Sequence, residues 1–460
     1  MQKIVVVALV VIVLVGAGAA APYWFGMQAE QAYKRSLEEV TKDGQVVITH
    51  QTYERGWLDS TAEATYTLGG APISLTATHK IHHGPIPFNG ELEFKPVLAL
   101  IVSQANLNLP APMKLPPITG KTIVHLEGNS ETHIAMAAGN SADPASGSSI
   151  TWQGLSGDST TSADMKQMTL KVILPLLQVN SVTQKFSMAQ AKIDANLQEG
   201  ASGLTTGSLS YSIDKLSGES DTGTMTINGL VLATSSTETG GNLSANIDLK
   251  MQSFSNATSS YGPGQINIKI RNLDTATLVK YQNEMRALQA NKLPAEQMPS
   301  MFMGKMLALV TSLSKKAPEM EITKINFKMQ DGEITGHGKL VLDGSKTDIS
   351  ENPGLLLMAL NGEGVLLVPK SAIRTLTELD LTRQVESLKA QGKLSEKEMK
   401  KLTPQKVSEI SSRAAPKYMD RYAANMKLVP DGDNYKVEAS LSQGQLLVNG
   451  EPTSGPVRLP

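Results

Sequence analysis

Strict alternation of apolar and polar residues over many short segments is the feature that most constrains the fold of this chain. Residues 242–252 read NLSANIDLKMQ, and every second residue from Leu243 to Met251 is apolar. Successive side chains of a strand point to opposite faces of a sheet, so this pattern predicts a strand with one apolar face. Residues 207–214 and 265–272 show the same alternation.

A hairpin signal and further alternating segments extend this prediction. Two alternating segments flank Asp331-Gly332 within residues 323–344, and Asp-Gly is a strong turn dipeptide. Further strands are predicted near residues 46–54, 61–68, 73–82, 121–127, 131–137, 168–174 and 435–448. We expect about twelve to sixteen strands, mostly antiparallel, each with one apolar face.

Helical periodicity appears mainly in the second half of the chain. A short helix is predicted over residues 28–42, a longer one over 273–291 and a Met-rich one over 295–315. Residues 370–426 predict two or three helices, with breaks near Gly392, Pro404 and Pro416. The fold class is therefore α+β, predominantly antiparallel β, with a large twisted sheet, a helical insertion and C-terminal helices.

The N-terminal segment predicts a single transmembrane helix. Residues 4–27 carry no charge and are long enough to span a bilayer. Tyr23, Trp24 and Phe25 suit the headgroup layer, and Lys3 places the N-terminus in the cytoplasm. A cleaved signal peptide, with Ala17-Gly18-Ala19 as its processing site, is the alternative. Both interpretations place the body outside the cytoplasm.

These patterns divide the chain into four regions. We expect an anchor at 1–27, a mainly antiparallel β body at 28–272, a helical hairpin at 273–320, and a closing region at 321–460 that combines a β hairpin, helices and final strands.

Charge and cysteine content exclude several classes of function. The chain has 42 basic and 43 acidic residues, which does not favour nucleic acid as a partner. It has no cysteine, so disulfides, iron–sulfur clusters, thiolate zinc sites and a cysteine nucleophile are excluded.

Three of the seven histidines lie close together in residues 77–88, ATHKIHHGPIPF. The alternation there predicts a strand, which places His82 on one face and His79 and His83 on the other. Along a strand His79 and His83 are about 13 Å apart, so no two of the three can chelate one ion locally. We therefore expect no metal ligand here, and imidazoles that form hydrogen bonds at a strand end.

No catalytic or nucleotide-binding motif occurs in the chain. The G-x-S-x-G elbow, the Walker A loop, the H-E-x-x-H helix and the G-x-G-x-x-G fingerprint are all absent. We therefore predict a non-catalytic protein without a cofactor, although the many serines leave a Ser/His/Asp triad open. The apolar strand faces could cradle acyl chains, but we expect helices 273–315 and 370–426 to cover them as an ordinary core.

Three local motifs carry a resemblance to a known family. YERGWLDS stands at residues 53–60, HGPIPF at 83–88, and LLVNGEP follows near the C-terminus. With the N-terminal anchor, this set resembles the YdgA family of Gram-negative envelope proteins. The matching positions are Tyr53, Arg55, Gly56, Ser60, His83, Gly84, Pro85, Pro87, Asn449 and Gly450. The family often has an acid before His-Gly-Pro, where this chain has His82.

The resemblance implies a single-pass inner-membrane protein with a periplasmic body that self-associates as a homodimer. It implies no known reaction, and it carries a link to surface motility. We expect a protein that acts through an envelope partner. A lipid-binding or lipid-transfer groove protein is the alternative, and a metal-dependent or serine hydrolase is the third choice. We further expect Arg55 and His83 to form a structural clasp at the end of the sheet that is nearest the membrane.

Overall fold

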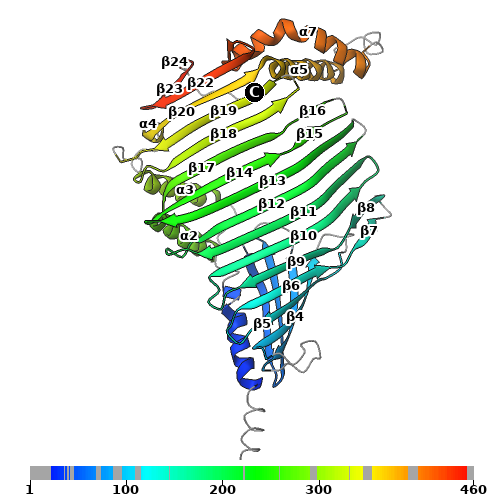
Figure 1. The fold of residues 1–460 in the computed structure, drawn as a ribbon, viewed down its shortest axis with the longest axis vertical. Coiled ribbons are helices and arrows are strands. Elements are labelled where there is room, and N and C mark those ends of the chain that lie inside the picture. Colours follow the sequence, from blue (N-terminus) through cyan, green and yellow to red (C-terminus); the bar gives the residue numbers. More distant parts are fainter. Residues whose placement is uncertain are drawn as a thin grey trace, which may run out of the picture. The chain divides into compact units, whose positions relative to one another are not determined.

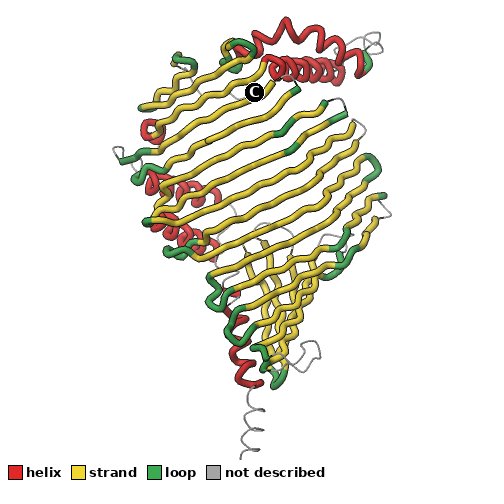
Figure 2. Tube along the Cα trace, viewed as in Figure 1, coloured by secondary structure: helices red, strands yellow, loops and turns green. Residues whose placement is uncertain are grey.

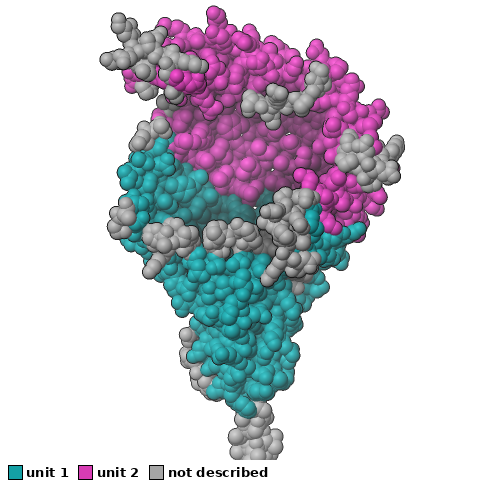
Figure 3. Space-filling model, turned by 180° about the vertical axis from the view of Figure 1, so that it is seen from behind, with its two compact units in different colours: residues 1–224, 233–238, 278–301 teal, residues 225–232, 239–277, 302–460 magenta. Residues whose placement is uncertain are grey.

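The structure is a computed structural model. It describes residues 22–35, 37–38, 41, 46–68, 74–85, 96–108, 115–143, 146–220, 223–257, 259–290, 298–330, 332–345, 355–391 and 402–452. The chain divides into two compact units (Figure 3). Unit 1 comprises residues 1–224, 233–238 and 278–301, and unit 2 comprises residues 225–232, 239–277 and 302–460.

Unit 1 is built on a sheet whose strands follow one another in the order β1–β2–β3–β4–β5–β6–β9–β10–β11–β12, each antiparallel to the next (Figure 1). The bounds are β1 Val46–Arg55, β2 Asp59–Leu68, β3 Ser74–His83, β4 Ala99–Asn108, β5 Ile118–Val124, β6 Ser130–Met136, β9 Leu155–Thr161, β10 Gln167–Asn180, β11 Gln184–Glu199 and β12 Thr205–Ser220. The strands β7 (Gly139–Asp143) and β8 (Ser148–Trp152) pair with each other, and β8 also pairs with the end of β10.

The N-terminal helix, residues 22–35, packs on the first strands of unit 1. Its Ala29 forms a buried cluster with Ala62 of β2, Ile81 of β3 and Ala99 of β4. The three alanines of this cluster allow the helix to lie close to the sheet. Ile81 is fully buried, and a buried side chain of this size contributes roughly 1.5–3 kcal/mol to stability.

Unit 2 contains a second run of antiparallel strands, in the order β14–β17–β18–β19–β20–β22–β23–β24 (Figures 1 and 2). The bounds are β14 Asn242–Met251, β17 Gly264–Asp274, β18 Glu319–Met329, β19 Gly332–Leu342, β20 Leu360–Pro369, β22 Asn434–Ser442, β23 Gln445–Val448 and β24 Glu451–Pro452. Short strand β21 (Val429–Asp431) pairs with β22. Strand β13 (Gly223–Thr239) contributes residues to both units, and β15 (Ser253–Ser255) pairs with it and with β16 (Ser260–Tyr261).

Helices stand at the ends of this second run and in the insertion before β18. The bounds are α2 Thr275–Ala290, α3 Met298–Ser314, α4 Leu356–Ala359, α5 Lys370–Ala390 and α7 Pro404–Asn425. The predicted helical region at 273–320 thus contains α2 and α3, and the predicted closing region contains β18 to β24 with α4, α5 and α7.

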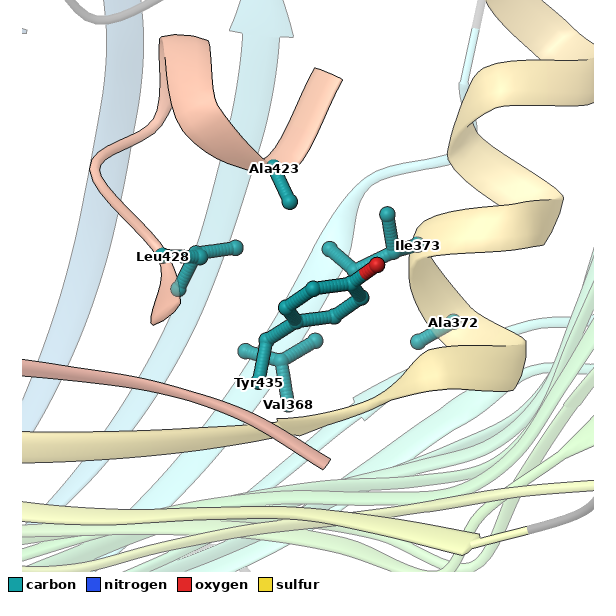
Figure 4. Packing of buried hydrophobic residues seen from close by; sticks show 6 residues of the cluster. All are labelled: Val368, Ala372, Ile373, Ala423, Leu428 and Tyr435. Carbon is teal, nitrogen blue, oxygen red and sulfur yellow. The ribbon is translucent and has the colours of Figure 1, made fainter. Parts of the chain in front are cut away.

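The main hydrophobic core of unit 2 lies where α5 and α7 meet the ends of β20 and β22 (Figure 4). Tyr435 of β22 is 2% exposed and packs with Val368 of β20 and Ile373 of α5. Its hydroxyl donates to Asp420 Oδ1 of α7 at 2.7 Å. Burial, together with this neighbouring carboxylate, raises the pKa of Tyr435 to about 12.

The helix boundaries agree with the sequence prediction at one proline and differ at another. Helix α7 begins at Pro404, where the Thr403 hydroxyl caps the backbone N–H of Lys406. The predicted break at Pro416 is wrong, because α7 continues through that residue. A proline inside a helix removes one hydrogen bond, but Ser411 and Ala415 beside it are buried, and packing of this face outweighs the loss. The predicted break at Gly392 lies outside the described residues.

The number of strands exceeds the prediction. The described residues form 24 strands, where we expected twelve to sixteen, and all of the described pairings are antiparallel. Strand β13 escaped prediction because Thr, Ser and Gly occur on both of its faces, which weakens the alternation. The predominantly antiparallel α+β fold is confirmed.

The predicted membrane anchor falls largely on residues that the structure does not describe. Within the described residues no helix combines the length and the apolar character that a membrane span needs. Residues 4–21 of the predicted anchor lie outside them, and residues 22–27 form the beginning of the N-terminal helix. The anchor therefore stays a prediction.

Candidate functional site

The motif residues 53–60 form the end of β1, a tight turn and the start of β2. Arg55 pairs with Ser60 in the register of these strands. The Gly56 N–H donates to the carbonyl of Asp59 at 2.8 Å. A Cβ at position 56 would lie 2.5 Å from that carbonyl oxygen, so the turn requires glycine.

His83 is buried at the end of β3 and has a defined tautomer. Its Nδ1 lies 3.2 Å from the carbonyl oxygen of Trp57, which can only accept, so Nδ1 carries the proton. The Ser60 hydroxyl then donates to Nε2 at 2.8 Å. Burial is the main cause that lowers the pKa of His83, which favours the neutral imidazole.

The pair of Ser60 and His83 has the hydrogen bond of a nucleophile and its base, but it lacks access to a substrate. Ser60 is 1% exposed and His83 is 2% exposed. The N-terminal helix also closes over the ring, because a Cβ on Gly26 would lie 2.5 Å from His83 Cε1. A reacting atom needs a place about 3 Å from the nucleophile, and this packing occupies it. The pair therefore connects the helix, β2 and β3.

His82 points to the other side of β3 and has an acidic partner. Its Nδ1 lies 2.6 Å from Asp59 Oδ1, and Asp59 is also its partner in the register of β2 and β3. The sequence resemblance left an acid–imidazole pairing in doubt, since His82 occupies the position of the family's acid. The structure places such a pair here, with the acid supplied across the strands.

Arg55 holds the N-terminal helix from outside the sheet. Its Nη1 lies 3.1 Å from Glu30 Oε2, and its Nη2 donates to the Tyr23 hydroxyl at 3.2 Å. The guanidinium also lies over the Tyr23 ring, 4.9 Å from its centre. The neighbouring Tyr53 packs against Tyr33 of the helix, with ring centres 5.5 Å apart. Burial is the main cause that raises the pKa of Tyr53.

Gly84 and Pro85 complete the motif cluster, which we define as the described motif residues from Tyr53 to Pro85. The Gly84 N–H donates to the carbonyl of Leu98 at 2.8 Å, and a Cβ there would lie 1.8 Å from the carbonyl oxygen of Val97. Glycine is therefore required for the close approach of the two segments. Pro87 lies outside the described residues.

Asn449 and Gly450 do not belong to the motif cluster, because they lie in unit 2. Both residues have positive φ, at 52° and 80°, and form the turn between β23 and β24. The Asn449 side chain accepts from the Glu438 backbone N–H at 2.9 Å and donates to the carbonyl of Lys427, just after α7. Their role in the fold is to fix this hairpin to the end of α7.

A cavity of about 240 Å³ lies beside the motif cluster in unit 1. Ala29 and Tyr33 of the N-terminal helix line it, together with His79 of β3. His79 Nδ1 lies 2.7 Å from Ser103 Oγ, and its Nε2 is buried without a hydrogen-bond partner among the described residues. Burial lowers the pKa of His79, so a small, largely apolar molecule would meet a neutral imidazole there.

An apolar sheet surface in unit 2 is a second candidate binding feature. The strand register aligns one apolar residue of each strand with the next, as in Ile247–Ile268–Ile322. We call this surface the apolar face. Its residues are Leu243, Ala245, Ile247, Leu249, Met251, Ile266, Ile268, Ile270, Met320, Ile322, Ile325, Phe327, Ile334 and Leu340.

The apolar face is not buried as a core would be. Among its described residues none is fully buried, and Leu249, Ile266 and Met320 are 38%, 37% and 40% exposed. The core under helices α5 and α7 buries Val368 of β20 and Tyr435 of β22, and Ile334 of β19 packs against its edge. The expectation that the helices cover the strands as an ordinary core therefore fails at Leu249, Ile266 and Met320, on β14, β17 and β18. Figure 3 shows unit 2 from behind, where its surface is hollowed.

The opposite side of the same strands is polar and internally paired. Glu319 contacts Arg271 and Lys339, the latter at 2.8 Å. Side-chain amides continue the pattern, as in Asn267 Nδ2 with Asn246 Oδ1 at 3.1 Å. The polar groups on this side are paired with one another and face water without cost. Burial by a ligand would therefore stabilise the apolar side, where it removes apolar surface from water.

Sequence reasoning missed the partners of the motif residues. Glu30, Gly26 and Tyr23 lie between 23 and 30 residues before the first motif, and no local pattern links them to Arg55 or His83. The alternation did identify the apolar faces of β14, β17 and β18. The one usable signal for the contact between the helix and His83 was Gly26, because a glycine in the first turns of a helix commonly allows another segment to approach closely.

In the described residues no group of three or more His, Asp or Glu side chains could hold a metal ion.

Comparison with other proteins adds a family but no activity. The search of curated proteins found no match to the chain. The sequence matches the family described as bacterial protein of unknown function (DUF945) over residues 1–455. Because this match extends along almost the whole chain, the protein belongs to the DUF945 family of bacterial proteins.

Proposed function

We propose that the protein binds acyl chains of envelope lipids on the apolar face of unit 2, as a lipid-binding or lipid-transfer protein without catalytic activity. The observation that carries the proposal is the partly exposed row of apolar side chains across β14, β17, β18 and β19, with Leu249, Ile266 and Met320 the most exposed. Each methylene group buried against such a surface contributes about 0.8 kcal/mol.

The chemistry of the face suits a flexible chain. Ile, Leu and Met side chains make non-directional contacts, and the described face offers no charged group to recognise a polar ligand. Contiguous exposed apolar surface of this kind marks an interaction or ligand site. The predicted N-terminal anchor would also keep the unit beside a source of lipid.

The test compares two neighbouring positions on opposite sides of β17. Because the chain has no cysteine, Ile268→Cys and Lys269→Cys each give one site for an environment-sensitive fluorophore. We expect vesicles of phospholipid to shift the emission at position 268 to the blue, and nitroxide groups on the acyl chains to quench it. The label at position 269, on the polar side, should respond little.

Equal responses at positions 268 and 269, or none at either, would overturn the proposal. Circular dichroism and the melting temperature of both labelled proteins establish that they are folded. Mass spectrometry of lipid that purifies with the unlabelled full chain gives an independent measure. Binding of a protein segment would shield position 268 from a soluble quencher without quenching by lipid nitroxides.

A second proposal follows from the resemblance to the YdgA family and from α3. We infer a homodimer of a periplasmic-facing inner-membrane protein that acts through envelope or motility-related partners. Helix α3 exposes Phe302 by 48% and Met303 by 69%, and methionine-rich surfaces adapt to a partner. The test of self-association is given below at the scale of the whole molecule.

A further inference from the structure

An exposed aromatic patch forms at the end of unit 1 where the N-terminal helix begins. We define the patch as Tyr23, Trp24, Trp57 and Leu58, whose exposed fractions are 38%, 52%, 56% and 46%. Two of its residues begin the helix, and two stand in the turn between β1 and β2. The patch holds two of the three tryptophans of the chain, and the third, Trp152, is buried.

Contacts between the two segments hold the patch together. The rings of Tyr23 and Trp57 have centres 5.4 Å apart and join the two segments. Within the helix, Trp24 packs edge-on against Phe25 at 5.1 Å. Arg55, the motif residue before the turn, lies over Tyr23 and binds Glu30 of the helix. The hydrogen bonds of the turn and the buried His83 fix the backbone of Trp57. The turn therefore holds Trp57 beside Tyr23, and Leu58 follows Trp57 in the chain.

The motif explains why the turn is tight but does not explain why its tip is apolar. Turns are normally polar, and an exposed Trp-Leu pair leaves large apolar area in contact with water. Trp and Tyr side chains combine an apolar ring with a polar group, and they favour the boundary between headgroups and acyl chains.

We propose that the aromatic patch rests in the headgroup layer of a phospholipid bilayer, so that the β1–β2 turn is a second membrane contact besides the predicted anchor. The sequence before the patch indicates that its partner is a bilayer. The uncharged run of residues 4–21 enters the described structure at residue 22, directly beside the patch. A run of that length as a helix extends about 27 Å, close to the thickness of a bilayer core.

The proposal does not depend on lipid binding by the apolar face. It assigns to the Gly-Trp-Leu turn, residues 56–58, the task of fixing one end of unit 1 against the membrane. The anchor alone would tether unit 1 to the membrane but would not fix its tilt relative to the membrane plane. A rigid contact at a second point, separate in sequence from the anchor, restricts that tilt.

The experiment uses the full chain in lipid nanodiscs with one fluorophore on a single cysteine. Leu58→Cys places the label in the patch. Val182→Cys, which is 81% exposed in the turn between β10 and β11 of the same unit, is the matched control. Two quenchers are compared: a phospholipid with a nitroxide on its headgroup, and iodide in the solution.

We expect the label at position 58 to be quenched several-fold more by the nitroxide lipid than the label at 182, and less by iodide. A second variant, Trp57→Glu in the Leu58→Cys background, should reduce the lipid quenching, whereas Val182→Glu should leave it unchanged. Melting temperatures show that each variant is folded.

Two outcomes would overturn the proposal. If the label at position 58 is as accessible to iodide as that at 182 and the nitroxide lipid does not quench it, the turn stands in water. If it is shielded from iodide but still not quenched by the nitroxide lipid, a protein surface covers the patch and no bilayer contact exists.

Discussion

At the scale of single residues, the imidazole at position 83 shows how far a motif predicts a role. The alternation of residues 73–83 assigned His82 and His83 to opposite faces, and the contacts of β3 with β2 agree with that assignment. The partners were not predictable, because Ser60, Trp57 and Gly26 reach His83 only through strand pairing and helix docking. A buried neutral imidazole also makes the stability of the protein sensitive to pH.

We predict that the free energy of unfolding decreases as the pH falls from 7.5 towards 5. Burial lowers the pKa of His83 and of His79 below the usual value of 6.5. The unfolded chain therefore binds protons at a higher pH than the folded chain, so stability is present above pH 6.5 and is lost below it. Each such group contributes a slope of at most about 1.4 kcal/mol per pH unit.

The measurement is denaturant unfolding at a series of pH values. His83→Gln should show a smaller loss of stability between pH 7.5 and 5 than the unmodified chain. His133→Gln is the control, because the His133 side chain is 60% exposed, and its dependence on pH should match that of the unmodified chain. An unchanged dependence in His83→Gln would contradict the assigned cause.

At the scale of elements, the docking of the N-terminal helix depends on the lack of a side chain at Gly26. We predict that Gly26→Ala destabilises the protein, although alanine is intrinsically about 1 kcal/mol better than glycine in a helix. The added Cβ would lie 2.5 Å from His83 Cε1, and overpacking of this kind costs about 1–3 kcal/mol. The melting temperature should fall.

Gly304→Ala in α3 is the matched control, because no atom lies within 4 Å of the Cβ that it would add. This substitution should leave the stability unchanged or raise it. Combining Gly26→Ala with His83→Ala removes the ring that clashes, so the cost of the alanine should shrink in that background. A stabilising effect of Gly26→Ala alone would show that the helix does not dock as described.

The elements also show which sequence signals predicted a turn or a helix end correctly. Asp331-Gly332 predicted a hairpin, and β18 and β19 pair around it from Met329 and Gly332. Pro416 predicted a break, and α7 passes through it because Ser411 and Ala415 are buried against their surroundings. Turn dipeptides act locally, whereas the effect of an internal proline depends on the packing around it.

At the scale of the whole molecule, the exposed part of α3 offers a surface for self-association. We predict that Met303→Cys in the otherwise cysteine-free chain forms a covalent dimer in membranes when a short bifunctional thiol crosslinker is added. Met303 is 69% exposed, so its substitution should not disturb the fold. The measurement is the fraction of dimer on a denaturing gel.

Leu379→Cys in α5 serves as the comparison, since Leu379 is also an exposed apolar residue, at 51%. It should give much less dimer than Met303→Cys. A chain that stays monomeric with both variants in membranes would count against the homodimer, and equal crosslinking at both would indicate random collision.

The sequence by itself determined that the chain forms amphipathic antiparallel strands, which side of β14, β17 and β18 is apolar, and where several turns stand. These properties follow from alternation and turn chemistry, which act within a few residues. Only the tertiary structure decided what covers each apolar side. The N-terminal helix buries Ile81 in unit 1, whereas the described face of β14 to β19 in unit 2 stays partly exposed. Burial depends on which elements meet in space, and no periodicity along one strand records that.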